Sequence, residues 1–413
     1  HLAFAGDGTL YVTFVASDFL NRVRNLTPRH VFLARSTDSG RSFTTVKVFD
    51  APDGNQDRGL NKGALVAVDP NNPQRVYVGW RQGVFANDAK EKLKSVVAAS
   101  ADGGRTFGPP VDLSDERGAD FPAIAVDRHG TVHAVLWVRT GLPPNTVPPR
   151  PIRHRRSTDQ GRTWSDAVDI DPGNVAASHP PLLAADPKTD DLYMVWHANG
   201  EVANTVPGFD GDLDVFVRVS RDAGRTWGDR VTLSDESIKA NQLEPGIAIS
   251  PNGTVHVAWY DFKHSPTNML VSTGHSGDTG ISDVYYTSST DHGGTWAKPV
   301  RVNDRGIDRS KGVWSNNIDS KFNVGVAATD TAVHFVWQDT RNALGETGSE
   351  DIYSSSVPLA PLKTGGDSGI PGWTLALTTV FGMGLGVAIA WLLMRQQGGV
   401  PKEPAMRETS AKV

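Results

Sequence analysis

The chain contains no cysteine among its 413 residues. This absence excludes a disulfide framework, a thiolate metal site and a cysteine nucleophile. A surplus of either charge is also missing, because 41 Lys and Arg stand against 46 Asp and Glu, for a net charge of −5. Without a basic surplus the chain has no electrostatic footprint for nucleic acid, so DNA and RNA are not expected as partners.

Long apolar runs are missing from most of the chain, and one occurs near its C-terminus. Trp373 to Met394 comprises 22 residues without a charged side chain. A helix of that length spans the roughly 30 Å of a bilayer's hydrocarbon core. A buried core helix is the alternative, but the run has no polar face. The sequence therefore predicts a single transmembrane helix at residues 372–394.

The charges on either side of the apolar run predict its orientation. Lys and Arg outnumber Glu after residue 394, which predicts a cytoplasmic tail at residues 395–413. The rest of the chain is then expected outside the cell, attached to the plasma membrane by one span. Gly382, Gly386 and Ala390 lie four residues apart, and small residues at this spacing allow close helix packing. They predict a dimer through this helix, although glycine is also simply common in membrane helices.

A repeated eight-residue motif, Ser-x-Asp-x-Gly-x-Thr/Ser-Trp/Phe, is the most informative feature that the chain does contain. A short Asp side chain can accept hydrogen bonds from nearby backbone N–H groups, and the Gly two residues later can adopt a positive φ. Each copy therefore predicts a tight hairpin turn. The five copies recur roughly 57 to 69 residues apart, which predicts a repeat architecture. They occupy residues 36–43, 100–107, 157–164, 220–227 and 289–296.

The motif resembles the Asp-box, or BNR repeat, of the sialidase superfamily. The resemblance covers residues 1–357 and implies an all-β fold, a six-bladed β-propeller in which each blade has four strands. Residues 245–302 show the repeat best, with expected strands at 245–249, 254–259, 283–289 and 296–302. The inner strands of the other blades are expected at residues 2–5, 63–68, 122–126, 180–185 and 322–328.

The two ends of the predicted propeller domain differ from the repeat. The sixth unit has no Asp-box and no fourth strand, so it is expected to show three strands of its own. The chain opens at His1 within a strand pattern and without a signal peptide, although an exported domain needs one. Upstream residues are therefore expected to be missing and to close the ring. Residues 358–371, rich in Pro and Gly, are expected to link the propeller to the membrane.

The resemblance implies candidate catalytic residues. Sialidases hold the carboxylate of a terminal sugar with three arginines, and use a Tyr nucleophile activated by a Glu and an Asp as acid/base. Glu244 lies nine residues before Gly253, as the Tyr-activating Glu does in the family. Asp18 is the sole carboxylate between Phe14 and His30, which makes it the candidate acid, although a lone loop Asp more often caps a turn.

The chain also departs from the sialidase pattern. Tyr260 stands where an arginine is expected, and Phe322 stands where the nucleophilic tyrosine is expected. Tyr260 carries no positive charge, and Phe322 has no hydroxyl for attack on an anomeric carbon. The Arg-Ile-Pro motif that carries the first arginine would fall before His1. Binding without hydrolysis is therefore the favoured prediction.

The loops opposite the Asp-boxes are expected to form the ligand face, because long loops on a rigid scaffold usually carry function. They include residues 81–94 and 303–321. Trp314 breaks the repeat pattern and is the first aromatic candidate for ligand contact. The predicted ligand-binding residues are Arg81, Tyr260, Asp261, Arg305, Trp314 and Arg341.

Carboxylates recur before the third strand of three late blades. Oxygen-rich loops of this kind suit Ca²⁺, the one metal considered, although the spacing matches no EF-hand. The favoured alternative is that Asp214, Asp283 and Asp351 bind backbone amides or a neighbouring arginine such as Arg341. The candidate oxygen ligands are Asp210, Asp212, Asp214, Asp261, Asp278, Asp283, Asp339, Glu350 and Asp351.

Aromatic and histidine side chains recur at fixed positions of the second strand. Sugar stacking is one interpretation of the tryptophans, but a residue repeated at one blade position more often packs between blades. The histidines are likewise expected to be hydrogen-bonded core residues. The tryptophans are Trp80, Trp137, Trp196, Trp259 and Trp337, and the histidines are His133, His256 and His334.

Three functions are compatible with these patterns. The leading prediction is a membrane-anchored, outward-facing sialidase-like propeller that binds a glycan or another surface ligand. The second is an exo-glycosidase of the exo-α-sialidase type that uses Glu244 and Asp18. The third is a protein-interaction propeller without catalysis. Convergent arginines and carboxylates in a central cavity would favour the glycosidase, and a shallow surface with scattered charges would favour protein binding.

Overall fold

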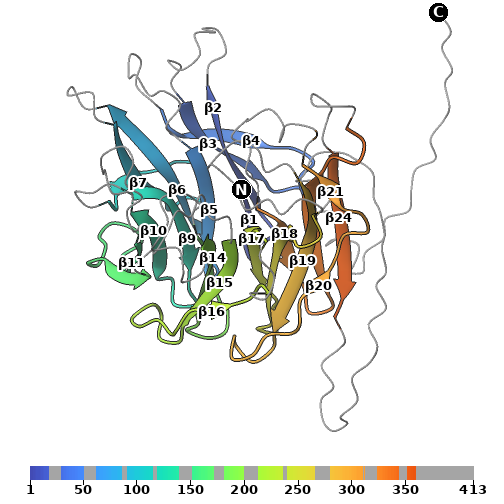
Figure 1. Ribbon diagram of the computed structural model, residues 1–413. Helices are drawn as coiled ribbons and strands as arrows, with labels where there is room; N and C mark the ends of the chain where they lie inside the picture. The colour runs from blue at the N-terminus through green and yellow to red at the C-terminus, as the bar shows by residue number, and fades with distance from the viewer. Residues whose placement is uncertain are drawn as a thin grey trace, which may run out of the picture.

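The computed structural model describes twelve segments of the chain, and in these all regular structure is β-strand. The strands form six antiparallel sheets that follow one another along the chain (Figure 1). This arrangement agrees with the predicted all-β propeller of six units. The described segments are residues 1–17, 29–50, 62–85, 91–114, 119–138, 151–171, 181–199, 213–235, 240–265, 280–309 with 311, 323–343 and 351–359.

Each of the first three sheets contains four strands in chain order. The first sheet comprises β1 (Leu2–Phe4), β2 (Leu10–Ser17), β3 (Arg29–Ser36) and β4 (Thr44–Phe49). The second comprises β5 (Lys62–Asp69), β6 (Asn72–Phe85), β7 (Glu91–Ser100) and β8 (Val111–Asp112). The third comprises β9 (Ala119–Val126), β10 (Val132–Val138), β11 (Ile152–Ser157) and β12 (Val168–Asp171).

The last three sheets repeat this order with two variations. The fourth comprises β13 (Leu182–Ala185), β14 (Leu192–Asn199), β15 (Leu213–Ser220) and β16 (Val231–Thr232). The fifth comprises β17 (Gln242–Ile249), β18 (Val255–Asp261), β19 (Ile281–Ser289) and β20 (Val300–Arg301), and β21 (Ile307–Asp308) also pairs with β19. The sixth comprises β22 (Gly325–Ala328), β23 (Ala332–Asp339) and β24 (Asp351–Pro358).

Consecutive sheets pack face to face through clusters of apolar side chains that span each pair of neighbours. In β10, Val132, Ala134 and Leu136 pack toward the second sheet, in one cluster with Tyr77. The alternate residues of that strand pack in another cluster, toward the fourth sheet. The first strands β1, β5, β9, β13, β17 and β22 also contact one another in sequence. Burial of both faces against neighbouring sheets is the packing that a propeller requires.

The recurring tryptophans and histidines are core residues, as predicted. The five tryptophans are at most 4% exposed. His133 contacts His154 and Asp127, at 3.0 and 3.1 Å. His256 lies 2.8 Å from the Tyr286 hydroxyl, and its other ring nitrogen lies 2.6 Å from the hydroxyl of Ser250. Both ring nitrogens of His133 and of His256 therefore have partners inside the protein, as buried polar groups usually do.

The Asp-box turns have the predicted chemistry. In the third sheet, Asp159 accepts hydrogen bonds from the Thr163 hydroxyl at 2.6 Å and the Thr163 N–H at 2.9 Å. The hydroxyl of Ser157 donates to Asp159 at 2.8 Å. These bonds to the charged form lower the pKa of Asp159 to about 2. Gly161 has a φ of 82°, which a residue without Cβ adopts freely.

The aromatic residue of the Asp-box differs between the first sheet and the others. Phe107, Trp164, Trp227 and Trp296 pack against the hydrophobic clusters between sheets. Phe43, in the first Asp-box, is 42% exposed. Each later Asp-box lies against the preceding sheet, as Gly161 lies near Tyr77, whereas Gly40 lies near Leu10 and Phe43 of its own sheet. The aromatic side chain therefore packs into the core between sheets in four of the five copies.

Two predicted strand and loop boundaries were wrong. The fourth strand of the fifth sheet was expected over residues 296–302, but β20 contains two residues and follows Pro299, which has no N–H to donate. Residues 81–94 were expected to form a loop. Instead β6 and β7 continue through that region in an extended hairpin, in which Arg81 pairs with Ser95 and Phe85 with Glu91. Cross-strand pairing therefore extends well beyond the core in the second sheet.

The sixth sheet shows three strands in the described part of the chain, as predicted. Antiparallel pairing places the turn between strands one and two at the same end of a sheet as the Asp-box. This end is called the Asp-box end, and the opposite end is called the loop end. Pro358, the first residue of the predicted linker, instead ends β24. The rest of the linker beyond Leu359, the transmembrane helix and the tail lie outside the described residues, as do the glycine stripe and Phe322. Within the described segments, no helix has the length and hydropathy of a membrane span.

Candidate functional site

Glu244 lies at the loop end of the fifth sheet, in an irregular part of β17. The pairing with β18 shifts register between Leu243 and Gly246, as in a β-bulge. Glu244 has a φ of 56°, a left-handed conformation that is uncommon for residues other than Gly. Its N–H donates to Nδ1 of His197 at 3.1 Å, and its carbonyl accepts from the Val324 N–H at 3.1 Å. Bulges of this kind redirect a side chain and often occur at functional sites.

Arg309 is the partner of Glu244, although the two residues are far apart in the chain. Its Nη2 lies 3.7 Å from Oε2 of Glu244, and the two side chains are 0% and 2% exposed. The Arg309 Nε donates to the Ser282 hydroxyl at 3.1 Å. The short strand β21 pairs with β19 immediately before Arg309 and so fixes its backbone. A buried ion pair therefore connects β17 with the segment that follows β20.

Tyr260 lies against this ion pair. The guanidinium carbon of Arg309 is 4.3 Å from the centre of the Tyr260 ring, and the tyrosine is 1% exposed. Burial raises the pKa of Tyr260 above its ordinary value, because a buried phenolate would lose its hydration. The hydroxyl is therefore a poor nucleophile at neutral pH. Tyr260 stands where the sialidase pattern has an arginine, and the positive charge beside it comes from Arg309.

Asp283 organises a second set of charges at the same end of the fifth sheet. It is 2% exposed and lies next to Ser282 on β19. One carboxylate oxygen is 2.9 Å from Nη2 of Arg301 and accepts from the Asn303 amide at 3.1 Å. The other is 2.9 Å from Nδ1 of His264, whose side chain is 54% exposed. A buried carboxylate therefore holds the Arg301 guanidinium and the His264 imidazole, both of which reach the surface.

Arg341 forms a third group of charges in the sixth sheet. Its Nη2 lies 2.7 Å from Asp339 and 2.8 Å from Asp304, and its guanidinium stacks 3.9 Å from the Tyr353 ring centre. Partial burial disfavours the charge, but the hydrogen bonds to Asp339 and Asp304 raise the pKa of Arg341 above its ordinary value. Arg341 therefore remains a cation, with its donors directed at two carboxylates.

The structure brings some predicted site residues together and separates others. Glu244 and Tyr260 share one cluster. Asp261 follows Tyr260 in the sequence and is 1% exposed, and its carboxylate accepts a hydrogen bond from the Lys263 N–H at 2.9 Å. Arg81 is 7% exposed and stacks 4.5 Å above the Phe121 ring, in the second and third sheets. Asp18 and Trp314 lie outside the described residues. Their roles stay predictions.

The candidate calcium ligands that the structure describes have donors from the protein. Asp214 accepts from the Ser234 hydroxyl at 2.8 Å, and Asp351 accepts from the Asn342 amide at 2.8 Å. Asp283 and Asp339 contact the arginines described above. These contacts support the alternative interpretation, in which the recurrent carboxylates hold neighbouring side chains. Asp210, Asp212, Asp278 and Glu350 lie outside the described residues.

Arg309 and His264 were not predicted from the sequence. Arg309 lies four residues after the predicted Arg305, which is exposed and whose carbonyl accepts from the Asn303 amide at 2.6 Å. The pairing of β21 with β19 decides which of the two arginines turns inward, and a two-residue strand leaves no periodicity in the sequence. His264 follows the strand-ending Tyr260-Asp261 pair, and its link to Asp283 crosses 19 residues.

A cavity of about 360 Å³ lies elsewhere in the molecule, at the Asp-box end between the third and fourth sheets. Polar side chains line most of it, including Arg156 and Arg225. It contains none of the predicted site residues.

Comparisons with known proteins give a fold and no family membership. No family model matches the sequence, and no curated protein matches it. Among solved structures, polysaccharide lyase Uly1 is similar over 93% of this chain and 81% of its own, with 11% identity and a TM-score of 0.52. Hadza microbial sialidase Hz136 has 18% identity over 82% of this chain, with a TM-score of 0.47. A Penicillium chrysogenum alpha-L-arabinanase complexed with arabinobiose has 15% identity, covers 78% of this chain and 83% of its own, and has a TM-score of 0.47.

These likenesses concern the fold alone. The chain spans 62% of the length of the sialidase that it matches. The likeness to Uly1 is one of fold, in agreement with the all-β sheets of the structure. Substrate and chemistry have to be argued from the site.

Proposed function

We propose that this protein is a carbohydrate-binding propeller that recognises its ligand with the loop end of the fifth sheet and does not hydrolyse it. The observation that carries the proposal is the charge arrangement around β19. Buried Asp283 holds the exposed side chain of His264 and the side chain of Arg301, which is 36% exposed. A guanidinium and an imidazole held in place by a buried carboxylate can form hydrogen bonds to hydroxyl and carboxylate oxygens, the groups that sugars present.

The buried Glu244–Arg309 pair supports this surface from below. It links β17 to the segment after β20, and Arg309 also donates to Ser282, the neighbour of Asp283. The pair therefore fixes the relative positions of the segments that carry His264 and Arg305. Arg305 is exposed and lies two residues before the start of β21. We infer that His264, Arg301 and Arg305 contact the ligand and that Glu244 and Arg309 are positioning residues.

The absence of hydrolysis follows from the chemistry of the same cluster. An exo-α-sialidase needs a hydroxyl nucleophile beside its Glu. The sequence has Phe322 at the position expected for that tyrosine. Tyr260 lies in the cluster, but burial raises its pKa, which disfavours attack by the phenolate. The glycosidase remains the second candidate, because Glu244 has the spacing of the family's activating residue and lies beside a tyrosine and an arginine.

The proposed setting is the outer face of the plasma membrane. The support is the charge-free run Trp373–Met394 and the basic residues after it. Protease treatment of intact cells tests this orientation. Digestion of an N-terminal epitope with protection of a C-terminal epitope is the expected result, and protection of both would contradict it.

A two-part experiment tests the function with the full chain in a mild non-ionic detergent. Binding is measured on an array of sialylated and neutral oligosaccharides, and hydrolysis is measured with a fluorogenic α-sialoside. We expect saturable binding to a subset of glycans and no release of fluorophore. The variant His264→Ala should weaken binding by tenfold or more, since a hydrogen bond whose loss leaves its partner unsatisfied costs about 1–3 kcal/mol.

Three outcomes would decide between the candidates. Turnover that is lost in Glu244→Gln and Tyr260→Phe would replace the proposal with the glycosidase. Glycan binding that is equal in wild type and His264→Ala would overturn the proposed surface. No glycan binding, together with saturable capture of a purified cell-surface protein, would favour the protein-interaction propeller.

A further inference from the structure

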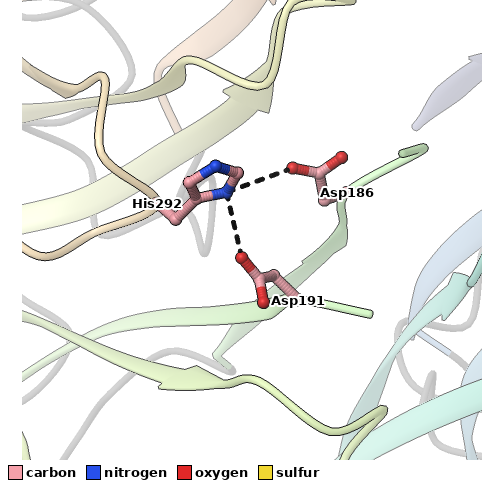
Figure 2. Close-up of side chains that lie close together, drawn as sticks. All are labelled: Asp186, Asp191 and His292. Atoms are coloured by element: carbon pink, nitrogen blue, oxygen red, sulfur yellow. Dashed lines mark ion pairs between the residues drawn. The ribbon is translucent and has the colours of Figure 1, made fainter. Parts of the chain in front are cut away.

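Three potential metal ligands meet at the Asp-box end, far from the loop-end clusters in the fold. Asp186 and Asp191 border the turn between β13 and β14, and His292 belongs to the Asp-box that follows β19. Figure 2 shows the imidazole of His292 pointing between the two carboxylates. Its Nδ1 lies 3.1 Å from Oδ2 of Asp191 and 3.9 Å from Oδ2 of Asp186. The three ligand atoms lie within 4.8 Å of one another.

Asp186 has one oxygen that the surrounding protein does not satisfy. The residue is 0% exposed, and its Oδ1 accepts from the backbone N–H groups of Lys188 and Thr189, at 2.7 and 3.3 Å. Its Oδ2 is buried and has no hydrogen-bond partner among the described residues. The 3.9 Å to His292 is too long for a hydrogen bond. A buried carboxylate oxygen without a partner is costly unless a cation binds it.

In the corresponding turn of the third sheet, the equivalent aspartate has a partner for both of its oxygens. Asp127 has the same place, and its Oδ2 lies 3.1 Å from Nε2 of His133 on the neighbouring strand. In the fourth sheet the residue at the position of His133 is Tyr193, whose hydroxyl donates to Asp191 at 3.3 Å. The core therefore supplies no imidazole to Asp186. The imidazole that faces Asp186 comes from the next sheet.

His292 is also unusual among the Asp-boxes. It precedes the Gly of its box, where the other four copies have Ser39, Gly103, Gln160 and Ala223. All five residues have a positive φ, and that of His292 is 61°. Only histidine among these residue types offers a strong metal ligand at this site. Gly253, from the turn between β17 and β18, lies beside the cluster, and a Cβ there would stand 3.5 Å from Oδ2 of Asp186.

We propose that Asp186, Asp191 and His292 bind a divalent transition-metal ion, Zn²⁺ foremost, that links the fourth and fifth sheets. Two ligands about 2.0 Å from a tetrahedral Zn²⁺ lie about 3.3 Å apart, close to the observed spacings of 3.1 and 3.9 Å. One imidazole with two carboxylates favours Zn²⁺ over Ca²⁺ or Mg²⁺, which prefer oxygen ligands alone. The half-exposed position of His292 leaves room for water as a fourth ligand.

Arg221 competes with the metal for one ligand. Its Nη1 lies 2.8 Å from Oδ2 of Asp191, and its side chain is 50% exposed. An exposed guanidinium can rotate into solvent at little cost, because exposed ion pairs contribute at most about 1 kcal/mol. Metal binding therefore replaces the Arg221 guanidinium with a metal ion at Asp191. It also gives Oδ2 of Asp186 a cation to bind.

The test uses the full chain in detergent, stripped with a chelator and titrated with ZnCl₂ in a calorimeter and in thermal melts. We expect one Zn²⁺ per chain and a rise in melting temperature. His292→Asn removes the imidazole while keeping a residue that tolerates positive φ, and Asp186→Asn keeps the Oδ1 bonds. Each variant should weaken Zn²⁺ binding by tenfold or more and abolish the rise in melting temperature. Arg221→Gln should tighten binding.

His129→Ala is the matched control, because His129 is 54% exposed at the same end and contacts Asp190 at 2.9 Å. It should leave Zn²⁺ affinity unchanged. The proposal would be overturned by a wild type that binds no Zn²⁺, by equal binding in His292→Asn, or by an equal loss in His129→Ala. Replacement of Zn²⁺ by Co²⁺ gives a spectroscopic check, since a site with the imidazole should show visible absorption that His292→Asn lacks.

Discussion

His129 at the Asp-box end and His264 at the loop end can be compared directly. Both side chains are 54% exposed, and each contacts a carboxylate oxygen at 2.9 Å. The partner of His129 is Asp190, which is 36% exposed and also contacts Arg128. The partner of His264 is Asp283, which is 2% exposed and also contacts Arg301 and Asn303.

The difference shows how the two ends use their charges. At the Asp-box end, the contacts of Asp190 with Arg128 and His129 lie near solvent and are screened. At the loop end, the exposed His264 and Arg301 are held by a carboxylate inside the protein, where screening is weak. A contact between a histidine and an aspartate therefore lies at the surface at the Asp-box end, whereas at the loop end it anchors the histidine on a buried carboxylate. This contrast is the physical basis of the proposed ligand face.

The largest expected effect comes from breaking the buried pair at the loop end. Glu244→Gln leaves Arg309 buried with no opposite charge at 3.7 Å. Removal of one partner from a buried pair costs about 3–5 kcal/mol, and urea unfolding of the full chain measures it. Asp190→Asn is the control at the Asp-box end and should cost less than about 1 kcal/mol. Similar losses in the two variants would contradict the contrast.

Acid sensitivity of the core gives the next largest effect. Burial lowers the pKa of His256 to about 4, from 6.5 in the unfolded chain. Because the unfolded chain takes up the proton first, the stability that this residue contributes is present above pH 6.5 and lost as pH falls toward 4. The loss amounts to roughly 3 kcal/mol.

Replacement of this histidine tests the pH prediction. Urea unfolding of His256→Gln, measured from pH 7 to pH 4, should show a shallower decline in stability than wild type. A slope that is the same in wild type and His256→Gln would show that His256 does not titrate as described.

Much of the fold could be predicted because its signal is local. An Asp-box needs eight consecutive residues, and Ser157, Asp159 and Thr163 form their hydrogen bonds within that stretch. The tryptophans could be assigned to the core because they recur at one strand position. The two-residue β20 and the long β6–β7 hairpin could not be predicted, since the extent of pairing depends on the partner strand.

The loop-end clusters were less predictable because they join distant residues. Glu244 was found by its spacing from Gly253, which is a local signal. Its partner Arg309 is 65 residues away, and the strand pairing of β21 with β19 decides that Arg309 and not Arg305 is buried. The Asp186–His292 contact likewise requires two adjacent sheets to be packed before the residues meet. Sequence patterns report such contacts only when a motif fixes both residues.

The smallest expected effect comes from the Asp-box itself. Thr163→Val removes the hydroxyl that donates to Asp159 at 2.6 Å. A single hydrogen bond near solvent contributes little, so we expect a fall in melting temperature of about 1–3 °C. The pKa of Asp159 should also rise from about 2. The depressed pKa stabilises the fold above pH 4, and this contribution is lost as pH falls toward 2.

NMR titration of the Asp159 carboxyl in both proteins measures the change. Thr44, which is exposed in β4 of the first sheet, offers a matched Thr→Val control outside any Asp-box. An unchanged Asp159 pKa in Thr163→Val would contradict the assigned cause.

The measurement that tests the central claim most directly is the affinity of the full chain for a glycan selected on the array, with the two histidines replaced one at a time. The account predicts that His264→Ala weakens binding by tenfold or more and that His129→Ala leaves it unchanged, although the two side chains are equally exposed and lie equally far from a carboxylate oxygen. Equal affinities in the two variants would contradict the assignment of ligand recognition to the loop end of the fifth sheet.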